Sequence, residues 1–154
     1  MANKQKIPVT IILFLIWIGW SILSTLFMFS INKSFIGPLF LEGISFVIYL
    51  LILLTIYSLI FYGTMKRKIW SRKLALIFFP LSVGLSLVNL ITYFINKDFI
   101  MGFFSQIKEM SQAVPIIPIE SLIISGLLFG LLSQGIITIL IIVLMIKKKD
   151  YFSR

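Results

Sequence analysis

The chain has 154 residues, of which 60% are hydrophobic and only 12% are charged, and its mean hydropathy is +1.11. A soluble domain is usually about 45–50% apolar and about 25% charged, so this composition excludes a soluble globular domain of this size and a disordered chain. The sequence therefore predicts an integral membrane protein.

The first apolar segment covers about residues 7–30 and contains no charge. About 20 apolar helical residues cross the ~30 Å hydrocarbon core of a bilayer, so this segment predicts a spanning helix that is retained as an anchor. Trp17 and Trp20 lie inside the segment, although tryptophan usually gathers at the membrane interface. We expect Trp17 to pack between helices, and the alternative is contact with an apolar or cationic ligand.

The second segment covers about residues 39–63 and carries Glu42 near its start, after Pro38. A carboxylate at a helix N-terminus is stabilised by the helix dipole and the exposed amides. Glu120 is placed in the same way before the fourth segment, after Pro118. The alternative interpretation is that Glu42 and Glu120 form a shared outer polar site that attracts a cation or an amine.

A short basic loop leads into the third segment, which covers about residues 73–95 and has no internal charge. Trp70 lies within this loop and is expected to anchor it at the interface. Polar residues lie on one face of the third segment, where Asn89 follows Ser82 and Ser86 at helical spacing.

Residues 96–120 form the one long connection, and their apolar side chains recur at three- and four-residue steps. These apolar positions are Phe99, Ile100, Phe103, Phe104, Ile107 and Met110. The pattern predicts an amphipathic helix over residues 99–112 that lies along the outer interface. Pro115 and Pro118 end it. The segment is either a loop against the bundle or, in the alternative, a lid or a docking surface.

The fourth segment covers about residues 121–146 and places small or polar residues four positions apart, at Gly126, Gly130, Gln134 and Thr138. Small residues allow close backbone approach in membranes, and polar residues form interhelical hydrogen bonds. We expect this face to pack against another helix, with Asn89 as the candidate partner of Gln134. The alternative is a polar patch that lines a small cavity.

Orientation follows from the basic residues, because cytoplasmic loops carry an excess of Lys and Arg. Eleven of the fourteen Lys and Arg residues lie in the N-terminal stub, the central loop or the C-terminal tail. Both termini are therefore expected in the cytoplasm. The residues expected to contact anionic lipid headgroups, and not nucleic acid, are Lys66, Arg67, Lys68, Arg72, Lys73, Lys147, Lys148 and Lys149.

The fold class that follows is an all-α integral membrane protein of the plasma membrane, formed by one domain over residues 1–154. It has four transmembrane helices, both termini inside, and an outer interfacial amphipathic helix between the third and fourth helices. The four apolar segments do not alternate polar and apolar residues with a period of two, which argues against a transmembrane β-barrel.

Three local patterns resemble small prokaryotic four-helix membrane proteins. They are KIPVTIILFLIWIGWSIL at the start, YGTMKRKIWSRKLALI in the centre and KKKDYFSR at the end. The chain departs from that pattern at Ser71, where an alanine often follows the tryptophan, and in its long amphipathic segment. The resemblance implies the topology and no activity.

The chain has no cysteine and no histidine, and only five acidic residues. Thiolate metal sites and the commonest general base are therefore missing, so we expect no enzyme activity, no cofactor and no metal. The expected function is that of an accessory subunit or small oligomer that works through helix packing, with a membrane-protein partner or self-association. The alternatives are a small transporter or channel for a neutral or lipid-like substrate, and an immunity-type membrane protein.

Overall fold

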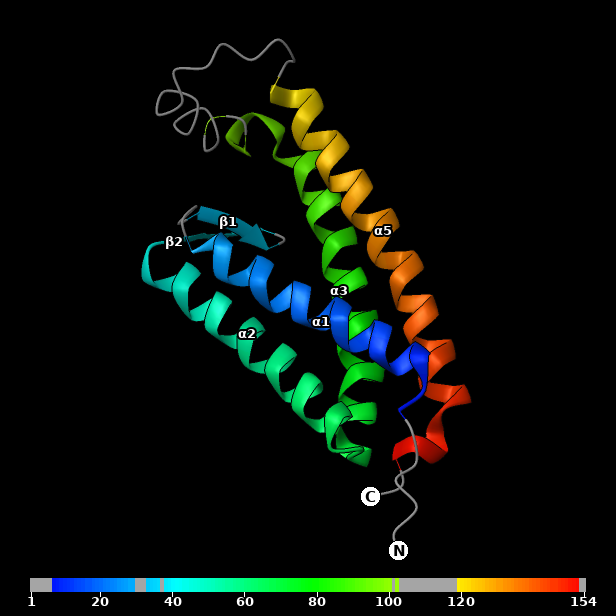
Figure 1. Cartoon of the computed structure of the whole chain (residues 1–154). Coiled ribbons are helices and arrows are strands. Elements are labelled where there is room, and N and C mark those ends of the chain that lie inside the picture. Colours follow the sequence, from blue (N-terminus) through cyan, green and yellow to red (C-terminus); the bar gives the residue numbers. More distant parts are fainter. Residues whose placement is uncertain (1–6, 30–32, 37, 101, 103–118, 153–154) are drawn as a thin grey trace, which may run out of the picture.

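The computed structural model describes residues 7–29, 33–36, 38–100, 102 and 119–152. Its elements are α1 (Val9–Met28), β1 (Lys33–Ile36), β2 (Leu39–Glu42), α2 (Ile44–Met65), α3 (Ile69–Ile95), α5 (Ile119–Lys147) and the 3-10 turn η1 (Lys149–Phe152) (Figure 1). Within these residues, four helices are long and apolar enough to cross a membrane. The predicted multi-pass helical architecture is confirmed at this level.

The start of the second helix is corrected by the structure. Helix α2 begins at Ile44, and residues 39–42 form the second strand of an antiparallel hairpin in which Phe35 pairs with Phe40. Gly43 adopts a φ of 57°, a conformation that suits glycine and turns the chain from β2 into α2. Ser45 Oγ donates to the carbonyl of Glu42 at 2.9 Å. Only Glu42 and Gly43 separate the apolar residues of β2 from those of α2, which explains why composition alone merged the two elements.

The predicted amphipathic helix over residues 99–112 lies mostly outside the described residues, since the structure does not describe 103–118. Residues 97–100 are helical. The amphipathic helix and its interfacial position stay predictions.

The helices are tightly packed at one end, which we call the basic end: α1 begins there, α2 turns into α3, and α5 ends in η1 (Figure 1). All four helices and η1 contribute to a cluster of buried side chains. Phe79 of α3 lies at its centre, with its ring centroid 5.3 Å from that of Trp17 and 6.2 Å from that of Phe14. The expected packing of Trp17 between helices is therefore observed.

The C-terminal turn η1 closes the basic end. Tyr151 and Phe152 are buried, with 9% and 1% of their surface exposed. Tyr151 Oη donates to the carbonyl oxygen of Thr64 at 3.2 Å, and the Arg67 guanidinium lies 4.9 Å from the Tyr151 ring centroid. The tail thus joins the end of α5 to the α2–α3 turn.

The α2–α3 turn itself is a Schellman motif, in which the N–H of Lys68 donates to Gly63 O at 2.8 Å and the N–H of Arg67 donates to Thr64 O at 3.1 Å. Arg67 occupies the left-handed position, with a φ of 57°. Gly63 allows the two helices to approach, because a Cβ built there would lie 2.5 Å from Ser71 Cβ.

The opposite end, which we call the hairpin end, is more open. Helices α1 and α2 lie side by side, as do α3 and α5, and the two pairs diverge toward the hairpin end (Figure 1). The contacts between the two pairs are therefore concentrated at the basic end, and space remains between the pairs beyond it.

We predict that Gly63→Ala lowers the free energy of unfolding by about 1–3 kcal/mol, the range for overpacking, because Ser71 Cβ is fixed to the α3 backbone. Gly84→Ala in α3 is the matched control, since a Cβ at Gly84 meets no atom within 4 Å; it should be neutral or stabilise by about 0.5–1 kcal/mol. Unfolding in mixed detergent micelles measures both. A Gly63→Ala variant as stable as the wild type would contradict the close approach.

Candidate functional site

A cavity of about 410 Å³ lies between the two helix pairs in the hairpin half of the bundle. Side chains from α1, α2, α3, α5 and β1 line it. Nine of these side chains carry a hydroxyl or an amide: Ser21, Ser24, Thr25, Tyr49, Tyr57, Ser82, Ser86, Asn89 and Gln134. We call this space, with these nine residues, the polar cavity.

Gln134 and Ser86 form the polar contact between α5 and α3 in this cavity. Ser86 Oγ donates a hydrogen bond to Gln134 Oε1. Gln134 lies thirteen residues before Lys147, which is about 20 Å along the helix and well inside a ~30 Å core. The amide is therefore held by a partner at a depth where an unsatisfied amide would be costly.

Several hydroxyls of the cavity donate to carbonyl groups of their own helix. Thr25 Oγ1 donates to Ser21 O at 2.8 Å, Ser21 Oγ to Trp17 O at 3.1 Å, and Ser82 Oγ to Phe79 O at 2.8 Å. A hydroxyl that donates in this way keeps oxygen lone pairs that can accept. Asn89 and Gln134 supply amide N–H groups by their chemistry. The lining thus offers both donors and acceptors to a guest.

The polar cavity has no ionisable carboxylate, amine or guanidinium among the described residues that line it. Ionisable residues inside a membrane normally accompany ion and proton pathways. No group of three potential metal ligands occurs in the part of the chain that the structure describes. The cavity's chemistry is that of neutral hydrogen bonding within apolar walls.

The β-hairpin reaches across the hairpin end of this cavity. Ile36 of β1 lines the cavity, and Phe40 of β2 packs against a second buried cluster formed by Tyr93 and Ile100. The Phe40 ring also meets Phe99 edge-on, with centroids 4.6 Å apart. The hairpin therefore connects the α1–α2 pair to the far end of α3.

The residues predicted to pack on one face of the fourth helix have different surroundings in the structure. Thr138 is buried and its Oγ1 donates to Phe79 O at 3.4 Å, while Gln134 and Asn89 both line the polar cavity. The described bond to Gln134 comes from Ser86, one turn from Asn89. At Gly126 and Gly130 a built Cβ meets no described atom within 4 Å, so their packing against a helix of another chain stays a prediction.

Of the two predicted outer carboxylates, one is placed differently from expectation and one is not. Glu42 lies in β2, before Gly43, and is exposed, so it is not in the first turn of α2. Glu120 lies in the first turn of α5, and its side chain is outside the described set. A shared site formed by Glu42 and Glu120 stays untested.

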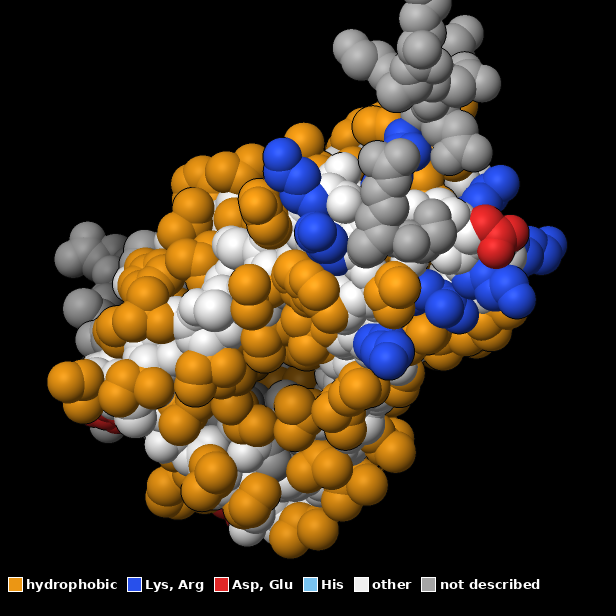
Figure 2. Space-filling model, turned by 90° about the horizontal axis from the view of Figure 1, so that it is seen from below, with side chains coloured by type: hydrophobic (Ala, Val, Ile, Leu, Met, Phe, Trp, Pro, Cys, Tyr) orange, Lys and Arg blue, Asp and Glu red, His pale blue; other side chains and the backbone are white. Residues whose placement is uncertain are grey.

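The predicted basic residues gather at the basic end, where Lys and Arg side chains occupy one part of the face and hydrophobic side chains cover the rest (Figure 2). Some of them also have structural contacts. Arg72 Nε donates to Met145 O at 2.8 Å, which joins α3 to α5, and Lys66 Nζ lies 6.0 Å from the Tyr62 ring centroid.

The contribution of α1 and α2 to the polar cavity was not predicted from the sequence. Ser21, Ser24 and Thr25 occur at three- and four-residue steps in an otherwise apolar helix, a spacing that places them on one face. Tyr49 and Tyr57 are eight residues apart in α2, again on one face. These spacings could have predicted the cavity.

No family model, no curated protein and no solved structure matches the chain. The resemblance to small prokaryotic four-helix membrane proteins rests on short motifs alone.

We predict a coupling energy between Ser86 and Gln134 of about 0.6 kcal/mol, and at most about 1.7 kcal/mol, as for other hydrogen bonds between membrane helices. A double-mutant cycle with Ser86→Ala and Gln134→Leu, followed by unfolding in mixed micelles, measures it. Ser58→Ala on the exposed side of α2 is the control and should be additive with Gln134→Leu. If the effects of Ser86→Ala and Gln134→Leu on the free energy of unfolding were additive, the hydrogen bond between the two residues would not form.

Proposed function

We propose that this chain is a non-enzymatic multi-pass protein of the cell membrane that binds a neutral, amphipathic molecule in the polar cavity. The supporting observation is the lining of the cavity, which combines nine hydroxyl or amide side chains with no described ionisable carboxylate, amine or guanidinium. Such a lining is unexpected in a bundle held together by apolar contacts alone.

The chemistry of the walls limits the ligand. A charged group buried without a partner is strongly unfavourable, so a neutral ligand is favoured over an ion. Leu53, Leu81 and Leu85 line the cavity beside the polar residues, which favours a ligand with an apolar part and a few hydrogen-bonding groups. If several copies assemble, the same site could serve a transporter for a neutral or lipid-like substrate.

The proposed orientation places the basic end in the cytoplasm, with both termini inside. Its support is the distribution of charge, since eleven of fourteen Lys and Arg residues belong to that side in the sequence. The hairpin end then faces outward. The ligand would enter from the outer leaflet or from the medium.

We predict that a variant with Lys147→Gln and Lys148→Gln, which removes two of the basic residues expected to hold anionic headgroups, binds dioctanoylglycerol at least about tenfold more tightly than dioctanoyl phosphatidic acid, because the polar cavity has no cation to pair with a phosphate. Native mass spectrometry in a mild detergent measures both ligands. Replacing Asn89 and Gln134 together by Leu should weaken binding of the neutral probe about five- to tenfold, as expected for the loss of two hydrogen bonds.

The control variant is Ser58→Leu, which changes an exposed residue of α2 outside the polar cavity. It should bind the neutral probe as the wild type does. Equal binding of the two lipids, or unchanged binding in the Asn89 and Gln134 variant, would contradict the proposed ligand class.

A second candidate function is that of an accessory or self-associating subunit. Gly126 and Gly130 form a GxxxG pair whose Cβ positions are open, and the neighbouring Phe129 and Leu132 are exposed. Glycine pairs of this kind let the backbones of two membrane helices approach closely. A helix from another chain would fill this space without any change in the bundle.

For this second candidate, we predict that Gly130→Ile leaves the free energy of unfolding of the monomer within about 0.5 kcal/mol of the wild type and weakens association about tenfold, because the new side chain separates the backbones. Energy transfer between labelled copies in vesicles measures association. Gly84→Ile, at an equally open glycine of α3, is the matched control. Identical association of both variants and the wild type would argue against the packing face.

A further inference from the structure

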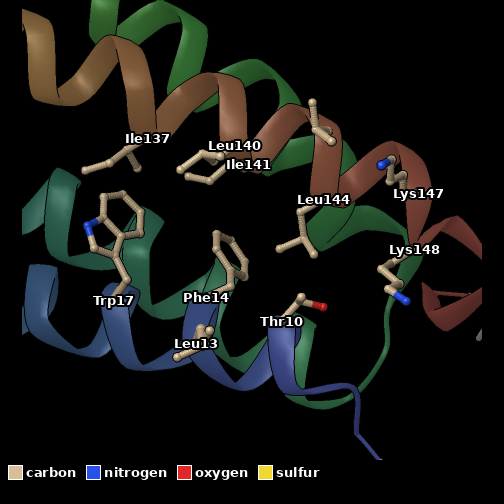
Figure 3. A pocket seen from close by; sticks show the side chains of 11 residues that line it. Thr10, Leu13, Phe14, Trp17, Ile137, Leu140, Ile141, Leu144, Lys147 and Lys148 are labelled. Carbon is tan, nitrogen blue, oxygen red and sulfur yellow. The ribbon is translucent and has the colours of Figure 1, made fainter.

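A second hollow lies at the opposite end of the bundle, between α1 and α5. It is a groove of about 470 Å³, distinct from the polar cavity and lined by α1 and the last turns of α5 and its continuation. Phe14 and Trp17 extend from α1 toward Ile137 and Ile141 of α5 (Figure 3). Helix α5 packs along α3 and has little contact with α1, which leaves this groove between them.

The groove is apolar along its length and polar at one end. Its polar side chains are those of Thr10, Lys147 and Lys148, which lie together where α1 begins and α5 ends (Figure 3). Since four helices here are long and apolar enough to span a bilayer, helix ends of this kind lie near the headgroups. The groove is therefore polar near the headgroups and apolar toward the membrane interior, as a phospholipid is.

We propose that this α1–α5 groove is a binding site for an anionic phospholipid, with an acyl chain between the helices and the phosphate at Lys147 and Lys148. The charge supports an anion, because Asp150 is the one acidic residue that the structure describes at the basic end. Lys148 is half-buried, and Lys147 ends α5. A phosphate at this end of the groove would balance the positive charge of the two lysines.

The dimensions support a lipid chain. Ten residues of α5 separate Ile137 from Lys147, a length of about 15 Å, which is half of the ~30 Å hydrocarbon core and therefore one leaflet. The groove holds about 470 Å³ over that length, and its apolar walls end at the two lysines, as an acyl chain ends at its headgroup.

Trp17 provides the readout, because it lines the groove. A variant with Trp20→Phe and Trp70→Phe keeps Trp17 as its single tryptophan, since the chain has three. The full-length variant is reconstituted in vesicles of phosphatidylcholine that contain increasing fractions of phosphatidylglycerol with brominated chains. Bromine quenches a tryptophan that it contacts. The comparison is with brominated phosphatidylcholine in the same vesicles.

We expect quenching of Trp17 by both lipids at high fraction, with about a 5- to 30-fold preference for phosphatidylglycerol, the range that one or two lysines give near an anionic surface. Lys147→Gln with Lys148→Gln should remove this preference. Lys66→Gln with Lys68→Gln removes the same charge from the α2–α3 turn, away from the groove, and should keep the preference. Size-exclusion chromatography checks that each variant is folded.

Three results would overturn the proposal. An equal loss of preference in both double variants would mean that surface charge alone attracts the lipid. Equal quenching by the two lipids in the unmodified groove would mean that the lysines do not select an anion. Protection of Trp17 from both brominated lipids would mean that another protein segment occupies the groove.

Discussion

The structure depends on a constraint of the bilayer, in which helices gain little hydrophobic free energy by packing together because lipid chains are as apolar as leucine. Helices therefore associate where their surfaces fit or where polar groups bond. Here the fit is at the basic end, at Gly63 against Ser71 and around Phe79. The polar contacts there are the Arg72 bond to Met145 O and the Tyr151 bond to Thr64 O. Together they hold both helix pairs at one end.

The two hollows are consequences of that arrangement. Helix pairs joined at the basic end diverge beyond it, and the space between them becomes the polar cavity, crossed by the hairpin. Its hydroxyls are tolerated in the membrane because several of them donate to carbonyls of their own helix. The α1–α5 groove exists because α5 follows α3 rather than α1. A neutral polar cavity toward the hairpin end and a groove with lysines at the basic end lead to two different proposed ligands.

Much of the fold followed from composition, because an apolar run of helical length in a membrane has few alternatives. The hairpin did not, since residues 39–41 are as apolar as the helix that follows and only Glu42 and Gly43 separate the two. In the site, Gln134 and Ser86 were placed on faces that the structure brings together. Gly126 was grouped with them by four-residue spacing, but each such step turns about 40° around a helix. Two steps from Gln134 the face has turned away, and no described neighbour is near.

The central claim is that the polar cavity admits water and a polar guest from the hairpin end, which the proposed orientation places outside the cell. The chain has no cysteine, so a thiol reagent reacts with an introduced cysteine and with no other residue of the chain. Ser86→Cys lines the cavity, whereas Leu87→Cys lies at the same depth of α3 on an exposed, lipid-facing side. A membrane-impermeant thiol reagent reacts with the thiolate, which forms in water and not in lipid. In intact cells we predict reaction at Ser86→Cys at least about tenfold faster than at Leu87→Cys. Equal rates, or reaction only from the cytoplasmic side, would contradict the account.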